Sequence, residues 1–259
     1  HIFLYEAGAP AFLCGLLTTC VDAPQGWLEW PRFEAALNPL NVHCAPPTLI
    51  CLENTHNQSG GTIYPQQHVV EIAERAHERG MRVHLDGARL FNAAIALGIS
   101  AKDLAATADT VSLCLSKGLA APAGTVLAGD KATLARARRW RKMLGGGMRQ
   151  SGILAAAGRH ALTHNVERLA DDHAQAATLA EHLTGIGAGE PGTPPRQATN
   201  MVFFTPRSGE RDALMAAMTA KGILLGGQRP TMRIVLHKGI DDTALDRTME
   251  AFSAVYRGR

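Results

Sequence analysis

The chain has 259 residues, of which 46% are hydrophobic and 19% charged, and its formal net charge is +3. This composition is typical of a globular chain with one large domain or a large and a small one. No run approaches the roughly 18 uninterrupted apolar residues of a membrane span, and the net charge is too small to indicate nucleic acid as a partner. The five cysteines form no C-x-x-C pair, which favours a reducing, cytoplasmic compartment.

The first half of the chain alternates between predicted strands and helices. An apolar strand over 48–53 is followed by a polar, Gly-rich loop over 54–64. Pro65, at the first helical position, begins a helix that ends before Gly80. Further strands are expected over 81–86, 110–115 and 124–128, with short helices over 90–97 and 101–107. This alternation predicts a mostly parallel sheet, with Cys51 and Cys114 inside buried strands.

The second half of the chain predicts a smaller unit. A basic helix follows Asp130, and 151–183 has an almost continuous helical pattern. The Gly- and Pro-rich run 185–198 is typical of an irregular connector. Beyond it we expect a strand over 200–205, a helix over 209–220, strands over 223–225 and 232–236, and a helix over 241–256. The sequence therefore predicts an α/β fold with a large domain, 1–165, and a small C-terminal α/β domain, 166–259, whose boundary lies inside the long helix.

Three polar side chains follow three successive predicted strands: His56, Asp86 and Lys117. The carboxyl ends of parallel strands gather at one edge of a sheet, where such folds bind ligands. A lysine and an aspartate at that edge suit pyridoxal phosphate, because the amine bonds covalently to the cofactor and the carboxylate keeps the pyridine nitrogen protonated. A lone loop lysine is usually only solvated, so the prediction rests on the three together. Arg89, three residues after Asp86, adds a cation for an anionic group.

Two other clusters favour simpler interpretations. The basic run 136–142 contains a single aromatic residue, Trp140, so a helix face near a phosphate or a subunit interface is favoured over a nucleic-acid site. Four histidines along the long helix are spaced four and nine residues apart, which does not build a metal site. We expect no metal and expect these side chains to be solvated: His160, His164, His173 and His182.

Several runs together resemble the L-threonine aldolases. HIFLYEAGAP from His1, LICLENTHNQSGGTIYP, HLDGARLFNAA, SLCLSKGLAAPAGTVLAGD and RRWRKMLGGGMRQSGILAAAG occur in the family's order, followed by NMVFF and MRIVLH. The resemblance covers essentially the whole chain. It implies the aspartate-aminotransferase-like fold of pyridoxal phosphate enzymes, known as fold type I, and pyridoxal 5'-phosphate as the cofactor.

The resemblance also implies a role for individual residues at the catalytic, cofactor-binding and substrate-binding positions. Lys117 would hold the cofactor covalently, Asp86 would pair with its pyridine nitrogen, His1 would stack on its ring, Arg149 would bind its phosphate, Arg89 and Arg233 would lie near the substrate carboxylate, and His56 would lie beside the β-hydroxyl. A histidine suits the transfer of the hydroxyl proton because its ordinary pKa of about 6.5 is near working pH.

The implied reaction is cleavage of L-threonine or L-allo-threonine to glycine and acetaldehyde by a homo-oligomer of two or four chains. The alternatives are a β-eliminating lyase on the same scaffold and an inactive, truncated chain that serves as an oligomer partner. The family's N-terminal Ser-Gly-Thr-type loop has no counterpart before His1, so we expect a segment of the natural protein to precede it. Ala120 and Ala123 stand where members often carry Gly and Val.

Overall fold

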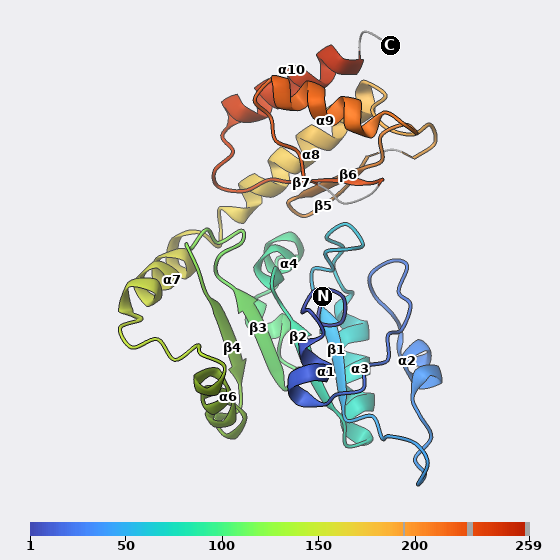
Figure 1. Ribbon diagram of the computed structural model, residues 1–259, viewed down its shortest axis with the longest axis vertical. Helices are drawn as coiled ribbons and strands as arrows, with labels where there is room; N and C mark the ends of the chain where they lie inside the picture. The colour runs from blue at the N-terminus through green and yellow to red at the C-terminus, as the bar shows by residue number, and fades with distance from the viewer. Residues whose placement is uncertain (194, 227–229, 257–259) are drawn as a thin grey trace.

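The structure, a computed structural model, describes residues 1–193, 195–226 and 230–256. Two sheets organise it, a four-stranded sheet in the lower part of Figure 1 and a three-stranded sheet in the upper part. Helix α8, Leu169–Gly185, leads from the junction into the upper part. The two parts therefore meet where the chain crosses between the sheets.

The first sheet has the strand order β1-β2-β3-β4. Strands β1 (Leu49–Glu53), β2 (Arg82–Asp86) and β3 (Thr110–Cys114) are parallel, whereas β4 (Thr125–Gly129) is antiparallel to β3. Helices α3 (Gln66–Glu78), α4 (Leu90–Leu97) and α5 (Ala101–Leu104) lie between the parallel strands in sequence. The mostly parallel sheet is confirmed. Pro65 is the N-cap of α3 and not, as predicted, its first residue.

The core of this part lies on one face of the sheet, against α3. Along β1, Ile50 and Leu52 are buried and pack in a cluster with Ile72 of α3, while alternate residues are exposed. Cys51 lies on the other face and is exposed, and Cys114 is half-buried, so their predicted burial is wrong. Parallel strands are buried on both faces only where both are covered. The alternation along β1 shows that one face is covered.

The N-terminal region and the far edge of the first sheet expose much of their surface. Helices α1 (Ala9–Cys14) and α2 (Trp30–Ala36) lie in a stretch for which the sequence predicted no element. Neither α1 nor α6 (Lys131–Met143) has a buried residue, and every residue of β4 is exposed. Helix α6 begins as predicted after Asp130, whose Oδ1 accepts a hydrogen bond from the Thr133 N–H over 2.9 Å.

The second sheet is antiparallel throughout, with the order β5 (Arg196–Ala198), β6 (Met201–Phe204) and β7 (Met232–Val235). Helices α8, α9 (Arg211–Ala220) and α10 (Asp242–Tyr256) pack with it around a second core. Strand β5 lies inside the run predicted to be irregular. The predicted strand 223–225 does not form. Ile223 and Leu225 pack against the core, and in the described part of this segment Gly226 makes an isolated bridge to Arg233.

The predicted continuous helix over 151–183 is wrong, because it is divided into α7 (Gly152–His164) and α8. Asn165 ends α7, and its buried side chain donates from Nδ2 to the Leu119 carbonyl over 2.7 Å and accepts from Lys238 over 2.9 Å. These contacts reach distant segments and leave no trace in local periodicity. The break at 165–168 coincides with the predicted boundary between the domains 1–165 and 166–259. The division of the chain into these two domains stays a prediction.

The histidines of α7 and α8 have different environments. His173 and His182 are half-buried, with His173 Nε2 3.1 Å from Asn92 Nδ2 and His182 Nε2 2.9 Å from the Met249 carbonyl, so their predicted solvation is wrong. His160 and His164 are exposed, with ring centroids 4.6 Å apart. Within the described ranges no group of three metal-ligating side chains occurs, and no helix is long and apolar enough to cross a membrane.

Candidate active site

The carboxyl ends of the three parallel strands lie side by side. Glu53, the last residue of β1, pairs in register with Asp86, the last residue of β2, and Asp86 pairs with Ser112 of β3. Parallel register places the ends of all three strands at one edge of the sheet, the edge at which His56, Asp86 and Lys117 are predicted to form a site. The loops that carry the polar residues after these strands begin at this edge of the sheet.

Asp86 is half-buried at the start of a tightly packed turn. Its Oδ1 accepts a hydrogen bond from the Ala88 N–H over 3.1 Å, and the Gly87 N–H donates to the Ser112 carbonyl over 2.9 Å. A Cβ at Gly87 would lie 2.9 Å from that same carbonyl oxygen, so only glycine fits without a shift. The turn thus holds the Asp86 carboxylate at the centre of the sheet edge.

Lys117 lies on the loop between β3 and β4. It is half-buried, and the described residues give its ammonium group no hydrogen bond or ion pair. The loop itself is held firmly: a Cβ at Gly118 would lie 2.8 Å from Leu169 Cδ2, and the Leu119 carbonyl accepts from Asn165. Ala120 adopts φ +58°, in the left-handed region that favours glycine. A fixed backbone therefore carries an amine that makes no hydrogen bond or ion pair with the part of the chain that the structure describes.

His56 lies on the loop after β1, which a backbone bridge to Thr62 closes. The Ser59 N–H donates to His56 Nδ1 over 3.2 Å, which assigns the proton of a neutral ring to Nε2. Burial lowers the pKa of His56 below its usual value, although the nearby Glu53 carboxylate opposes this. The imidazole is therefore held neutral in a half-buried position close to the strand ends.

His1 contacts the strand end directly through Glu53. Its Nδ1 lies 2.9 Å from Glu53 Oε1, its amino nitrogen lies 3.0 Å from Glu53 Oε2, and its ring centroid lies 5.0 Å from that of Tyr5. The Glu53 side chain is only 12% exposed. The ring predicted to stack on the cofactor thus lies at the same edge as Asp86 and His56.

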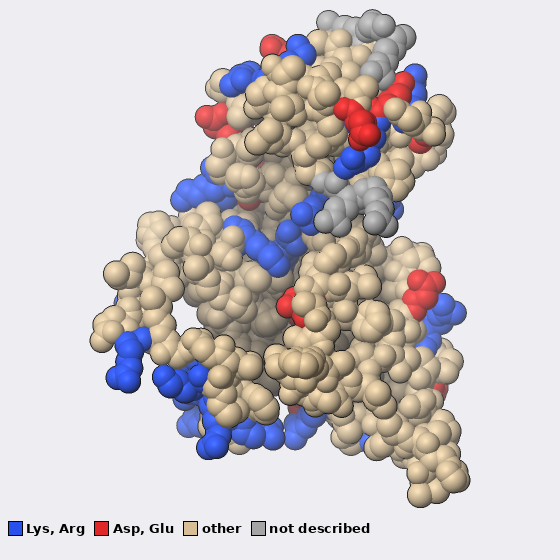
Figure 2. All heavy atoms as spheres, in the orientation of Figure 1, with Lys and Arg blue, Asp and Glu red and all other residues tan. Residues whose placement is uncertain are grey.

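Two arginines from different parts of the chain meet at Asn57. Arg89, the N-cap of α4, and Arg233 of β7 donate to Asn57 Oδ1 over 3.1 and 2.7 Å. Burial and the proximity of Arg233 lower the pKa of Arg89, while Cys114 and the acidic residues oppose this. Figure 2 shows basic side chains gathered where the two parts meet, beside a hollow. Because the Asn57 oxygen is neutral, it does not balance the charge of the two arginines, and this favours binding of an anion.

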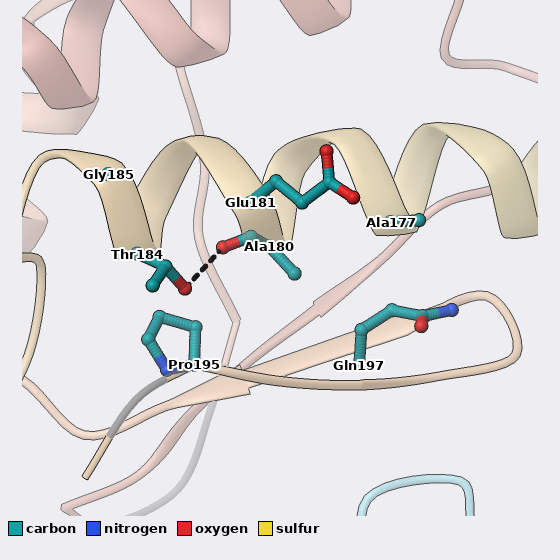
Figure 3. A pocket seen from close by; sticks show the side chains of 7 residues that line it. All are labelled: Ala177, Ala180, Glu181, Thr184, Gly185, Pro195 and Gln197. Carbon is teal, nitrogen blue, oxygen red and sulfur yellow. Dashed lines mark hydrogen bonds between the residues drawn. The ribbon is translucent and has the colours of Figure 1, made fainter.

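Arg149 is not brought into this group. It is exposed on the loop between α6 and α7, and no contact with Asp86, Arg89 or Lys117 is present in the described chain. Its predicted contact with the cofactor phosphate stays a prediction without structural support. A shallow groove elsewhere, between α8 and β5, is lined by Glu181, Thr184 and Gln197 and contains none of the predicted site residues (Figure 3).

Sequence reasoning missed two residues that organise the site, Glu53 and Asn57. Both belong to the run ENTHN, which also contains His56. This run was the sequence signal that could have pointed to the two residues. Their importance arises from contacts with His1, Arg89 and Arg233, which a linear pattern does not reveal. The resulting donor set fits pyridoxal phosphate: an unoccupied amine, a carboxylate on the adjacent strand end, and arginines for anionic groups.

Comparison with known proteins identifies the family. A family model described as beta-eliminating lyase matches residues 1–208. The low specificity L-threonine aldolase of Escherichia coli strain K12 is 42% identical over 238 residues, which are 92% of this chain and 69% of that protein. The chain belongs to the low-specificity L-threonine aldolase family.

Solved structures agree with this threonine aldolase family assignment at the level of the fold. The Leishmania major threonine aldolase superposes with a TM-score of 0.79 at 22% identity, covering 99% of this chain and 75% of that one. The N-acetylornithine aminotransferase of Stenotrophomonas maltophilia superposes with a TM-score of 0.58 at 19% identity, covering 82% and 58%. The predicted aspartate-aminotransferase-like fold is confirmed.

Proposed function

We propose that this chain is a pyridoxal phosphate-dependent aldolase that cleaves L-threonine or L-allo-threonine to glycine and acetaldehyde. The observation that carries the proposal is the Lys117 ammonium, to which no described residue bonds, on the loop that follows the strand next to Asp86. Family membership supports it, since the E. coli relative bears the name low specificity L-threonine aldolase.

The cofactor, when bound, accepts the electron pair released as the Cα–Cβ bond of the substrate breaks. Lys117 would hold it covalently through its amine. Asp86 would keep the pyridine nitrogen protonated, because an ionised carboxylate stabilises the positive charge beside it. The Ala88 N–H bond to Asp86 Oδ1 favours the ionised state that this role requires.

The substrate would be oriented by its carboxylate. Arg89 and Arg233 both point at Asn57 Oδ1, and their combined charge would be balanced by a carboxylate placed there. Fixing the carboxylate decides which Cα bond stands perpendicular to the cofactor ring, and hence which bond breaks. Two arginine anchors therefore select cleavage of the bond to Cβ.

The two histidines would handle the β-hydroxyl. His56 is neutral and half-buried on the loop that contains the run ENTHN. Both histidines lie close to the Glu53 carboxylate, His1 at Oε1 and His56 at Oε2. A neutral imidazole accepts a proton at one nitrogen and donates at the other. The hydroxyl proton would thus be removed within the site, and not by bulk water.

A second function is favoured by the description of the matching family model, a β-eliminating lyase. The two reactions differ in their products. Retro-aldol cleavage releases glycine and an aldehyde, whereas β-elimination releases a keto acid and ammonia. The same amine and carboxylate would serve either reaction, so the products decide between them.

The test is product analysis on the chain loaded with pyridoxal phosphate. L-threonine and L-allo-threonine are supplied separately, and glycine, acetaldehyde, keto acid and ammonia are measured, with Lys117→Ala as the control. We expect glycine and acetaldehyde in equal amounts. Keto acid and ammonia without aldehyde would instead support β-elimination. A chain that shows no cofactor absorption band and no turnover would be the inactive homologue.

We further propose a cytoplasmic homo-oligomer of two or four chains. All five cysteines are free, as expected in a reducing compartment. Exposed apolar side chains on α1 and near α6, such as Phe12, Trp140 and Ile153, support burial against further copies. Gel filtration with light scattering measures the number of chains directly.

A further inference from the structure

The carboxylate of Glu53 lies close to both histidines, His1 and His56. It is the last residue of β1, and its nearly buried carboxylate lies 2.9 Å from His1 Nδ1 through Oε1 and 4.0 Å from His56 Nε2 through Oε2. Oε1 also accepts a hydrogen bond from the Asn57 N–H over 2.9 Å. The other charged groups around Glu53 are the amino group of His1, 3.0 Å from Oε2, Asp86 on the adjacent strand, and Arg89.

The contact with Glu53 determines the tautomer of His1. An ionised carboxylate only accepts hydrogen bonds, so the hydrogen of the 2.9 Å contact is on His1 Nδ1. When His1 is neutral, its Nε2 then carries a lone pair. The ring is thereby prepared to accept a proton at Nε2, and the carboxylate stabilises the imidazolium that results.

His56 has the opposite arrangement. Its Nδ1 accepts from the Ser59 N–H, so Nε2 of the neutral ring carries the hydrogen. At 4.0 Å, Nε2 is too far from Glu53 Oε2 for a hydrogen bond, although the negative charge still favours a hydrogen on that side. The Nε2–H therefore remains available as a donor to a ligand.

We propose that Glu53 is a positioning residue that holds His1 and His56 in complementary proton states, His1 as an acceptor and His56 as a donor towards the substrate β-hydroxyl. This inference rests on the proposed function. During cleavage the O–H bond breaks and an N–H bond forms at His1 Nε2, while His56 donates to the oxygen that becomes the aldehyde carbonyl. The proton balance closes because the reaction transfers one proton from the hydroxyl to Cα of glycine.

The variant that tests this proposal is Glu53→Gln. Glutamine has the same shape and keeps an acceptor for the Asn57 N–H, so the loop that carries Asn57 is retained while the charge is lost. Glu29→Gln is the matched control, because Glu29 forms another carboxylate–histidine pair, 3.7 Å from His68. Glu53→Asp retains the charge on a shorter side chain. Thermal unfolding establishes that each variant is folded.

The first readout is nitrogen-15 NMR of the imidazoles without cofactor, with His56→Phe used to assign the His56 signals. In Glu53→Gln the amide oxygen still accepts from His1 Nδ1, so we expect the tautomer of His1 to be kept but the charge that stabilises its imidazolium to be lost. The pKa of His1 should therefore fall, and the pKa of His56 should fall further, by at least about 0.5. Glu29→Gln should change neither, and Glu53→Asp should keep the wild-type pattern. Unchanged titration of both imidazoles in folded Glu53→Gln would overturn the proposal.

The second readout is the kinetics of the loaded enzyme. Glu53→Gln should lower kcat at least about ten-fold with little change in KM, and the acid limb of the pH profile should move to lower pH. A lower kcat with an unshifted limb would mean a structural role and would also overturn the proposal. If the wild-type chain cleaves neither epimer, the proposed function fails, and the NMR result alone decides the role of Glu53.

Discussion

Arg89 and Arg233 donate to the same oxygen, Asn57 Oδ1, over 3.1 and 2.7 Å, although Arg89 is the N-cap of α4 and Arg233 lies on β7 of the second sheet. Two like charges at one neutral acceptor repel each other, and the effect is strong where burial has removed water. A carboxylate at this place would relieve the repulsion. The pair therefore links the second sheet to the edge of the first through the side-chain oxygen of Asn57.

Replacing Arg233 by Lys should weaken substrate binding more than it slows the chemistry. Lysine keeps the charge but lacks the planar fork that binds a carboxylate through two hydrogen bonds. We expect KM for L-threonine to rise at least about ten-fold with a smaller change in kcat. Steady-state kinetics measures both. Arg196→Lys, on β5 of the same sheet, is the control, and an equal effect there would argue against a carboxylate clamp.

Lys117→Ala should abolish turnover and leave the fold intact, because the side chain makes no described contact that the fold needs. Borohydride reduction of the loaded wild-type chain should attach the cofactor to one peptide, which mass spectrometry identifies. Lys102→Ala, in α5, should retain activity and labelling. A label on Lys102 or Lys131 would refute the assignment of Lys117.

Asp86→Asn should lose most of kcat with a smaller effect on KM. The amide oxygen of asparagine still accepts from the Ala88 N–H, so the turn is preserved, but a neutral group cannot keep the pyridine nitrogen protonated. The visible spectrum of the loaded variant and its kinetics provide the check. Near-normal kcat would show that Asp86 has another role.

His56→Phe should change the preference between the two epimers of threonine. The β-hydroxyl points in different directions in L-threonine and L-allo-threonine, while the carboxylate anchors are the same. We expect the ratio of the two kcat/KM values to change at least about five-fold, roughly 1 kcal/mol of differential transition-state binding. Equal losses on both epimers would reject a role in specificity, and no loss would remove His56 from the site.

Stability should decrease as the pH falls from about 7 to 5. Burial lowers the pKa values of His56, His84 and His173 below their ordinary value, so the unfolded chain binds protons that the folded chain does not. The stabilising effect of the neutral rings is complete above the ordinary value of about 6.5 and is lost as the pH falls through the lowered values. Urea unfolding across this range measures it.

The control for this pH dependence is His173→Gln, which should reduce the slope because glutamine does not titrate and can still bond to Asn92. A free energy of unfolding that is constant or rises towards pH 5 would contradict the prediction. The carboxyl group of Asp109 changes its protonation state below the pH range from 7 to 5. Although desolvation opposes it, hydrogen bonds from the Val83 N–H, Arg82 and His77 lower its pKa to about 2, so its contribution is lost only below about 3.8.

The sequence alone determined the order of the elements and the strand-end positions of His56, Asp86 and Lys117. Both follow from local information, because hydrophobic periodicity marks each strand and parallel sheet geometry aligns the strand ends. The prediction from sequence was wrong where a local pattern is compatible with more than one structure. The proline-free run 151–183 is interrupted at Asn165 by bonds to Leu119 and Lys238, and Cys51 sits on the uncovered face of β1.

Only the tertiary structure decided how the site is assembled. Arg233 and Asn57 are 176 residues apart in sequence, and His1 and Glu53 are 52 apart, yet each pair is in hydrogen-bond contact. Such contacts form because the second sheet packs beside the edge of the first and because His1 lies near the end of β1. Periodicity within one element carries no information about which distant charge will meet it, so the contacts of Glu53 with His1 and of Asn57 with the two arginines could be found only in the folded chain.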